Sequence, residues 1–359
     1  MRDLALAFLV AASLAACSEA RSDTTGWEAE NPVTSLPEAP LGVADHVNWG
    51  KLEALQGLKV TPEKVRLGRW LFFDPRLSSD GTVSCATCHR PGYAFSEPLP
   101  TSKGMRGQVG SRKAPPIVNA AFPIEPVYFW DGRASTLAEQ AKGPIENPIE
   151  MGSTHAFCAE SVGRIEGYRK VFRQVYGNEN VTIDRIADAI AAYEATLFSG
   201  NSEWDRYQAD EEATIAPEVK LGADLFHGKA QCNQCHLGFN FTDSKFHNLG
   251  VGWDASANAY KDEGRKKVTG KPEDLGAFKT PTLRDVTRHA PYLHDGSVAT
   301  LKEVVELYDR GGVPGAPNLS PKIKRLGLTK EEVDAIVAFL EALTGDNDYA
   351  GAAPASLPE

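Results

Sequence analysis

The sequence contains two copies of the pattern Cys-x-x-Cys-His, and no other feature constrains the fold of the chain as much. In this pattern two thiols can bond to the vinyl groups of a porphyrin, while the adjoining His places an imidazole nitrogen beneath the iron. The alternatives are a zinc site or a redox-active thiol pair, but a His directly after both pairs favours haem. We therefore predict two covalently bound haem c groups. The predicted attachment residues are Cys85, Cys88, Cys232 and Cys235, and the predicted iron ligands are His89 and His236.

A weak internal repeat surrounds these motifs. Leu67-Gly68-x-x-Leu71-Phe72 precedes the first motif, and Leu221-Gly222-x-x-Leu225-Phe226 precedes the second. Each run places apolar residues on one face of a helix that ends close to a haem motif. We therefore predict a mostly α fold with two cytochrome c-like domains, each carrying one haem. The predicted domains are residues 45–200, with the first haem, and residues 201–346, with the second.

The two ends of the chain have a different character. An apolar run too short to span a bilayer follows Met1-Arg2-Asp3, which predicts a signal peptide over residues 1–17 and export to the periplasm. Leu14-Ala15-Ala16-Cys17 is similar to a bacterial lipobox, so Cys17 is a candidate lipidation site; ordinary cleavage nearby is the alternative. A lipid on Cys17 is then the one expected link to a membrane. Residues 18–44 and 347–359 have no apolar period, which predicts a flexible tether and a disordered tail.

Charge and proline content bear on function. The formal net charge is −10, which argues against nucleic acid as a partner; a basic electron-donor protein or a neutral small substrate fits better. Residues 119–151 contain four prolines and little periodicity, so a long loop is predicted there, and a loop of that length is usually functional.

Longer stretches also flank the two motifs. They are Phe129-Trp130-Asp131-Gly132-Arg133, Asn147-Pro148-Ile149-Glu150-Met151, Phe278-Lys279-Thr280-Pro281-Thr282-Leu283-Arg284 and Ala290-Pro291-Tyr292-Leu293-His294-Asp295-Gly296. With them the chain resembles the bacterial dihaem cytochrome c peroxidases, and more narrowly their MauG-like branch. The resemblance implies that the first haem meets hydrogen peroxide and that the second supplies or stores an electron.

The resemblance also implies roles for two further residues. Glu150 matches the acid/base that moves the peroxide proton, a task that a carboxyl group can perform in both directions. Without the flanking motif Glu150 would be read as a solvated loop carboxylate. Trp130 matches a residue that conducts electrons between the haems, although from the sequence alone it is equally a core tryptophan.

The sixth ligands depart from the common family pattern. Relatives of the ordinary type have a Met on the second haem, whereas this chain has only three methionines, Met1, Met105 and Met151, and none in its C-terminal half. Tyr308 matches that position, as in the MauG-like branch. An anionic oxygen stabilises ferric and higher oxidation states relative to Met. Without the family alignment Tyr308 would be read as a core tyrosine on the apolar stripe of its helix.

Two more departures concern the loop from Thr101 to Pro116. Many relatives place a gating His there; this chain has none between His89 and His155. We therefore expect an open first haem, with Met105 as a candidate weak ligand. Relatives also hold calcium through an Arg-Asn-x-Pro pattern. Here Lys113 replaces the Asn, and a Lys cannot ligate a hard cation, which argues against calcium.

Three functions are consistent with this pattern. The first is a MauG-like enzyme in which peroxide produces a high-valent dihaem state that oxidises a partner protein or an electron donor. The second is an ordinary dihaem peroxidase that reduces hydrogen peroxide to water. The third is a dihaem electron carrier, which would need neither Glu150 nor an open iron. Tyr308 and the missing gating His favour the first.

Overall fold

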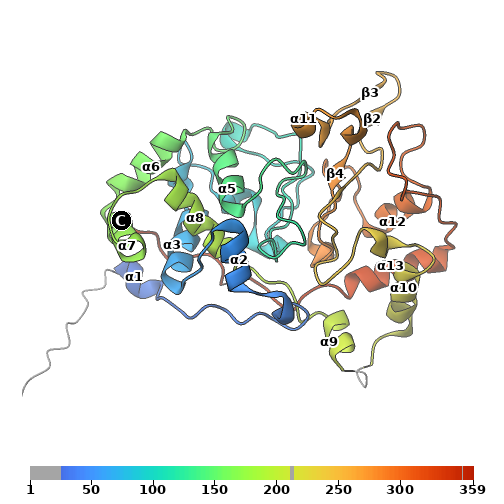
Figure 1. The fold of residues 1–359 in the computed structure, drawn as a ribbon, viewed down its shortest axis with the longest axis horizontal. Coiled ribbons are helices and arrows are strands. Elements are labelled where there is room, and N and C mark those ends of the chain that lie inside the picture. The colour runs from blue at the N-terminus through green and yellow to red at the C-terminus, as the bar shows by residue number, and fades with distance from the viewer. Residues whose placement is uncertain (1–25, 211–213, 350) are drawn as a thin grey trace, which may run out of the picture.

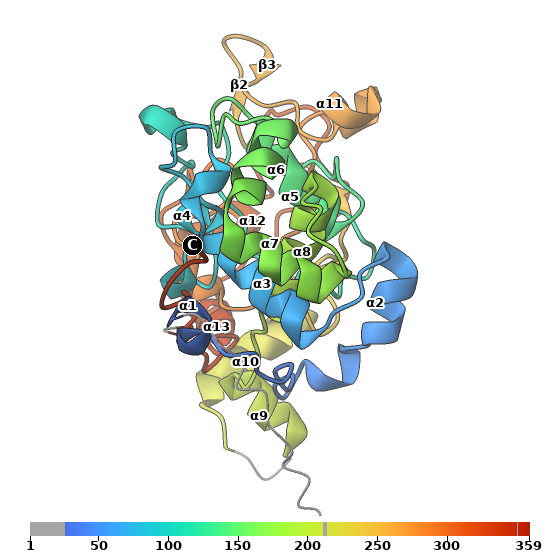
Figure 2. The same ribbon diagram turned by 90° about the vertical axis from the view of Figure 1, so that its left-hand side faces the viewer.

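The computed structural model describes residues 26–210, 214–349 and 351–359 (Figure 1). In these residues the N-terminal half consists of helices joined by long loops. Its helices are α1 (Gly26–Glu30), α2 (Trp49–Gln56), α3 (Pro62–Phe73), α4 (Cys85–Cys88), α5 (Leu137–Glu146), α6 (His155–Arg164), α7 (Glu166–Tyr176) and α8 (Ile183–Glu194). Figure 2 looks onto this half and shows α3, α7 and α8 packed together.

The C-terminal half is also mainly helical. Its helices are α9 (Glu203–Ala209), α10 (Pro217–His227), α11 (Lys266–Thr269), α12 (Leu301–Asp309) and α13 (Lys330–Glu341). Its strands are β1 (Phe246–His247), β2 (Trp253–Asp254), β3 (Ala259–Tyr260) and β4 (Phe278–Lys279). β1 pairs antiparallel with β4, and β2 pairs antiparallel with β3. The predicted mostly α fold is confirmed. None of the helices in the described ranges is long and apolar enough to cross a membrane.

The internal repeat appears as two matching helix crossings. α3 packs against α8 in the first half, and α10 packs against α13 in the second. A Cβ atom built on Gly68 would lie 1.8 Å from the carbonyl oxygen of Ala189, and one built on Gly222 would lie 1.9 Å from that of Ala335. The two backbones of each pair therefore touch, which only glycine permits. The Leu-Gly step of the repeat marks this contact in both halves.

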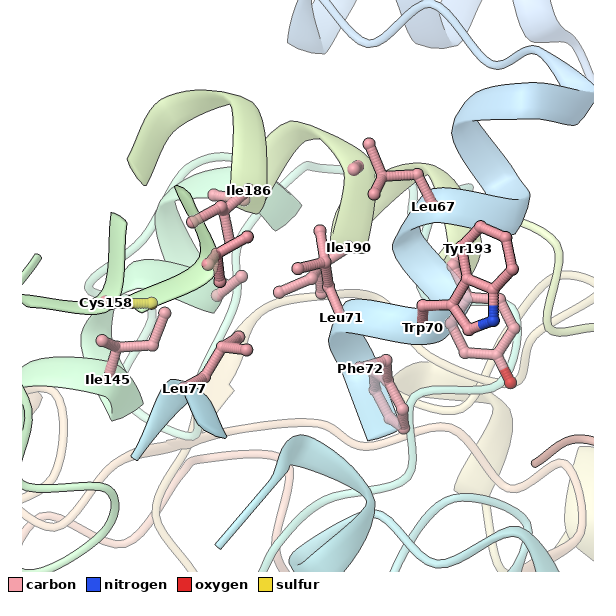
Figure 3. Packing of buried hydrophobic residues seen from close by; sticks show 14 of the residues in the cluster. Leu67, Trp70, Leu71, Phe72, Leu77, Ile145, Cys158, Ile186, Ile190 and Tyr193 are labelled. Carbon is pink, nitrogen blue, oxygen red and sulfur yellow. The ribbon is translucent and has the colours of Figure 1, made fainter. Parts of the chain in front are cut away.

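Each half has its own buried core. In the first, Leu67 and Leu71 of α3 face Ile186 and Ile190 of α8 (Figure 3). In the second, Phe226 of α10 packs among residues of α12 and α13. Separate cores are expected of separate domains, and they agree with two cytochrome c-like units.

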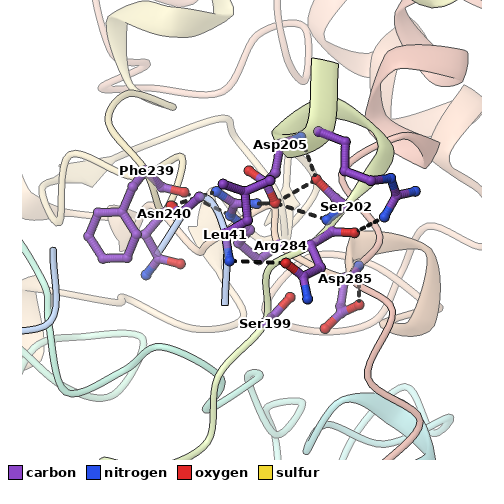
Figure 4. A network of polar contacts seen from close by, with 12 residues as sticks. Leu41, Ser199, Ser202, Asp205, Phe239, Asn240, Arg284 and Asp285 are labelled. Atoms are coloured by element: carbon purple, nitrogen blue, oxygen red, sulfur yellow. Dashed lines mark hydrogen bonds and ion pairs between the residues drawn. The ribbon is translucent and has the colours of Figure 1, made fainter. Parts of the chain in front are cut away.

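A polar network lies where the chain passes from one half to the other (Figure 4). The Arg284 guanidinium and the Asp205 carboxylate lie 2.5 Å apart, with side-chain exposures of only 2% and 4%. Arg284 Nε also donates to the carbonyl of Phe239, and Asp205 accepts from the amide and hydroxyl of Ser202. A charge pair this deeply buried needs such extra hydrogen bonds to offset its desolvation. The network fixes the start of α9 against the segment that contains Arg284.

The N-terminal tether prediction needs correction over its described part. Trp27 is 7% exposed, and its ring centroid lies 5.2 Å from that of Trp70 on α3. Order therefore begins by Gly26 and not at Asp45. The short tether helix α1 lacks an apolar period because one aromatic side chain makes the contact. The signal peptide and Cys17 lie outside the described residues.

The prediction of a disordered C-terminal tail is also wrong. Residues 351–359 lie along the N-terminal domain. Arg69 donates to the carbonyls of Gly351, Ala352 and Ala353, and Trp70 Nε1 donates to that of Ser356. The tail is held by its backbone carbonyls, so its side chains carry no periodic signal. It ties the end of the second domain to the first.

Candidate active site

The first Cys-x-x-Cys-His motif lines a cavity that reaches from the N-terminal domain to the domain boundary. Ser84 caps the short helix α4, which carries Cys85 and Cys88, and His89 follows it directly. His89 Nδ1 lies 3.0 Å from the carbonyl oxygen of Phe95. A hydrogen bond there leaves Nε2 free, which is how a haem-ligating His is usually oriented. Burial lowers the pKa of His89, so the imidazole is neutral and able to bind a metal.

The second motif lines a separate cavity and repeats this geometry. Cys232 lies in the 3-10 helix η5 (Cys232–Gln234), and Cys235 and His236 follow. His236 Nδ1 lies 2.9 Å from the carbonyl oxygen of Phe241. Burial raises the pKa of the Cys88 thiol to about 11 and that of the Cys232 thiol to about 12, so neither is a ready thiolate. Because Cys88 lines one cavity while Cys232 and Cys235 line the other, the two thiol pairs do not form one four-cysteine zinc site. Both sites fit a covalently held haem.

Tyr308 lies where the sequence places it, in the second cavity. It is carried by α12, whose start is fixed by a capping box between Thr300 and Glu303. It lines the same cavity as His236, Cys232 and Cys235. Burial raises the pKa of the Tyr308 phenol well above its ordinary value, so the phenol is protonated unless a cation binds its oxygen. Ferric iron held by His236 would supply such a cation.

Glu150 lines the first cavity together with Cys88 and His89. Asn147 Nδ2 donates to Glu150 Oε1 at 2.7 Å, and the amide of Met105 donates to the Glu150 carbonyl at 2.8 Å. Burial raises the pKa of Glu150 above that of a free Glu, although Arg133 and Asn147 oppose the shift. The carboxyl group is thus held in place, and it keeps its proton to a higher pH than a free Glu does.

Trp130 lies in the wall between the cavities and lines both. Its indole Nε1 donates to the carbonyl of Lys113 at 2.9 Å, and its own carbonyl accepts from the amide of Lys279 at 2.8 Å. Its ring centroid lies 6.4 Å from that of His294. The structure thus brings Trp130 between the two predicted haem sites.

The structure places the side chain of Met105 outside the first cavity, and its role as a weak iron ligand stays a prediction. Its side chain is buried in the N-terminal core, where Sδ accepts a hydrogen bond from Ser79 Oγ at 2.8 Å. Its methyl group lies so close to Gly152 that a Cβ there would be 2.4 Å from it. Met105 does not line the first cavity. Its thioether therefore points away from any iron held by His89, and its backbone, which holds Glu150, is the part that serves the site.

Lys113 is buried, and its ammonium donates to the carbonyls of Glu97 and Leu99, the latter at 3.1 Å. Burial lowers its pKa to about 8. A side-chain cation therefore already contacts these carbonyls. The argument against calcium stays a prediction.

Sequence reasoning missed three groups at the cavities. Arg112 forms ion pairs with Asp131 in the first domain and Asp262 in the second, at 2.6 and 2.7 Å. Glu194 on α8 is 4% exposed, lines the first cavity and has an unpartnered Oε2. Lys279 lines both cavities. Of these three, only Glu194 could have been recognised from the sequence, because a charged residue four positions after Ile190 falls beside the apolar stripe of its helix.

Comparisons with known proteins agree with this geometry. The model of the di-haem cytochrome c peroxidase family matches residues 62–213. The methylamine utilization protein MauG of Methylorubrum extorquens is 39% identical over 292 residues, which cover 80% of each chain. Cytochrome c551 peroxidase of Nitrosomonas europaea is 40% identical over 298 residues, covering 82% of this chain and 85% of that protein. The crystal structure of a MauG-like protein associated with microbial copper homeostasis superposes with a TM-score of 0.75 and 32% identity, covering 88% of this chain and 95% of that one.

Proposed function

Because the chain belongs to the di-haem cytochrome c peroxidase family, we propose that it is a MauG-like enzyme, which uses hydrogen peroxide to oxidise a partner protein or electron donor. The observation that carries the proposal is the difference between the two cavities. Glu150 lines only the first, Tyr308 lines only the second, and Trp130 lines both. Peroxide chemistry thus belongs to the first site and storage of an oxidising equivalent to the second.

In the first cavity, the chain supplies a proton carrier. Haem bound by Cys85, Cys88 and His89 would supply the iron that accepts peroxide oxygen. Glu150 takes a proton from one peroxide oxygen and returns it to the other, a task that suits a carboxyl group whose pKa is raised above that of a free Glu. Asn147 holds Oε1 of that carboxyl group in place.

In the second cavity, the chain supplies the ligand pair His236 and Tyr308. A phenolate oxygen favours oxidised iron and lowers the reduction potential relative to a Met sulfur. This distinguishes the proposal from an ordinary peroxidase, whose second haem must donate electrons readily. The chain is about equally similar to MauG and to a cytochrome c551 peroxidase, so we choose between these two functions on the basis of Tyr308.

Electron paramagnetic resonance and Mössbauer spectroscopy test the proposal, with the ferric protein examined before and after one equivalent of hydrogen peroxide. We expect both ferric signals to disappear without an organic radical signal. The Tyr308→Met variant should lose only one ferric signal and should show a radical or a need for prior reduction. Tyr349→Phe is a matched control, because Tyr349 is a partly buried tyrosine of the C-terminal segment outside both cavities. A radical together with one remaining ferric signal in the wild type would identify an ordinary peroxidase. An unreactive protein would identify an electron carrier.

We also propose that the protein acts in the periplasm, anchored through lipid on Cys17. The support is the apolar run after Asp3 and the Leu-Ala-Ala-Cys sequence. Fractionation of cells that express the full chain tests this. The wild type should be found with the membranes and the Cys17→Ser variant should not; equal distribution of the two would refute lipidation.

A further inference from the structure

Lys279 is a basic residue in the wall that the two cavities share. It ends β4, which pairs antiparallel with β1, and its amide donates to the carbonyl of Trp130. Its side chain is partly buried and lines both cavities. The backbone of Lys279 is therefore hydrogen-bonded to that of Trp130, and both residues lie between the two haem sites.

The other basic side chains around the first cavity have partners. Arg112 binds Asp131 and Asp262, Arg133 binds Asp131, and Lys267 lies 3.4 Å from Asp262. Lys279 differs: in the described part of the chain its ammonium has neither a carboxylate partner nor a hydrogen bond. Burial alone lowers its pKa to about 8. Burying an ammonium without a counter-ion costs free energy, so a bound anion would stabilise Lys279 at this site.

The second cavity has an excess of positive charge. No Asp or Glu of the described residues lines it, although the chain as a whole has a net charge of −10. Its basic residues are Lys113, Lys279, Lys322 and Lys324. Lys113 and Lys322 donate to backbone carbonyls, and Lys324 is exposed to solvent. Lys279 is thus the partly buried cation that remains available to an anion in this cavity.

We propose that Lys279 is a shared counter-ion for the carboxylates of both haems. Haem carries two propionate groups, and they are its only anionic side chains. The cavities are otherwise built for haem by the Cys and His residues, so these carboxylates are the anions that the wall meets. The inference rests on haem binding and does not depend on which peroxide reaction follows. Lys279 is therefore a positioning residue: it contacts the cofactors and acts on the iron through its charge.

One consequence is electrostatic coupling of the two sites. A positive charge close to both haems makes oxidation of either iron less favourable by a similar amount, and so raises both reduction potentials together. The difference between the two potentials then stays set by the other groups at each site. It also holds the pKa of the haem carboxylates low, because a neighbouring cation favours the ionised form.

The test is spectroelectrochemistry of the fully loaded Lys279→Met protein beside wild type and Lys271→Met. We expect both potentials of Lys279→Met to become more negative by an amount equivalent to about a tenfold change in the ferric to ferrous ratio, or about 59 mV. Its potentials should also become pH-dependent between about pH 5 and 7, since the carboxylates lose the cation that keeps them ionised. Lys271→Met removes the same charge at an exposed position outside both cavities, where water screens it, and should leave both potentials near wild type.

Two further variants make the result decisive. Lys279→Arg keeps the charge and should keep both potentials. If Lys279→Met binds less than two haems by pyridine haemochrome assay, Lys279→Gln takes its place, because an amide still hydrogen-bonds a carboxylate but is uncharged. A change confined to one haem would overturn the shared role. Lys279→Met potentials equal to those of Lys271→Met would overturn the proposal altogether.

Discussion

Replacing Gly222 by Ala should separate α10 from α13. The new Cβ would lie 1.9 Å from the carbonyl oxygen of Ala335 and 2.9 Å from Cβ of Phe339, both well inside ordinary contact. The nearest atom is the carbonyl oxygen of Ala335 in the backbone of α13, so no side-chain rotation can relieve the clash. Overpacking of this kind costs up to about 3 kcal/mol, against about 1 kcal/mol gained from the better helix propensity of Ala. The net loss of about 2 kcal/mol should lower Tm by about 4–8 °C.

Gly50→Ala is the matched control, since Gly50 also lies inside a helix but its nearest contact would be Asn48 Oδ1 at an ordinary 3.6 Å. It should leave Tm unchanged or raise it slightly. Differential scanning calorimetry measures both variants. Phe226, on the same helix as Gly222, lines the second cavity, so the spectrum of the second haem should change while that of the first does not. A Gly222→Ala protein as stable as wild type would refute the close backbone contact.

Four further results are expected. Glu150→Gln should slow the reaction with peroxide by about 10²–10⁴-fold, while Glu146→Gln, a half-exposed neighbour, should not. The wild-type rate should rise with pH through the pKa of Glu150, at a higher pH than for a free Glu, because only the ionised carboxylate accepts the peroxide proton. Burial raises the pKa of Glu194 to about 8, so between about pH 4.5 and 8 the folded protein keeps a proton that the unfolded chain releases. The free energy of unfolding should therefore decrease as the pH rises through this range. Glu194→Gln should remove this pH dependence. Asp205→Asn should cost about 3–5 kcal/mol, because it leaves Arg284 buried without its counter-charge.

Stopped-flow absorption and urea unfolding check these four predictions. Equal slowing by the two glutamate substitutions would show that Glu150 has no special role in proton transfer. A rate independent of pH between about pH 4 and 8 would contradict the titration of Glu150. The Glu194 reasoning fails if wild type and variant show the same pH dependence of the urea midpoint. An unchanged midpoint in Asp205→Asn would show that the buried pair contributes little.

The starts of several helices can be recognised from local signals in the sequence. Thr61 accepts a hydrogen bond from the amide of Lys64 at the start of α3, with Pro62 at the first helical position. Thr300 and Thr329 cap α12 and α13 in the same way. These caps depend on residues three positions apart, so no tertiary contact is needed to recognise them.

Predictions failed where distant segments decide the structure. Residues 119–151 were expected to form a loop, yet α5 lies within them and includes Pro144. A proline inside a helix costs a hydrogen bond, and here packing of α5 against α8 compensates. The tail after Asp346 is ordered by Arg69 and Trp70, far away in the sequence.

The same division holds for the candidate site. The haem motifs could be predicted because the residues that attach the haem and bind its iron lie within five consecutive positions of the sequence. The direction of the Met105 side chain could not, because it depends on Ser79 and Gly152. Nor could the role of Lys279, because it depends on two cavities meeting at this residue and on the lack of a carboxylate partner among the described residues.

The two halves share a scaffold, so the difference in their chemistry must come from a few side chains. Gly68 and Gly222 make the same helix contact, and His89 and His236 have the same hydrogen bond from Nδ1 to a backbone carbonyl. Proximal ligation therefore cannot make one haem reactive and the other a store. That distinction falls to other residues of the two cavities: Glu150 with its proton at the first and Tyr308 at the second. A change at Tyr308 should consequently alter what the enzyme does with peroxide more than how fast it reacts with it.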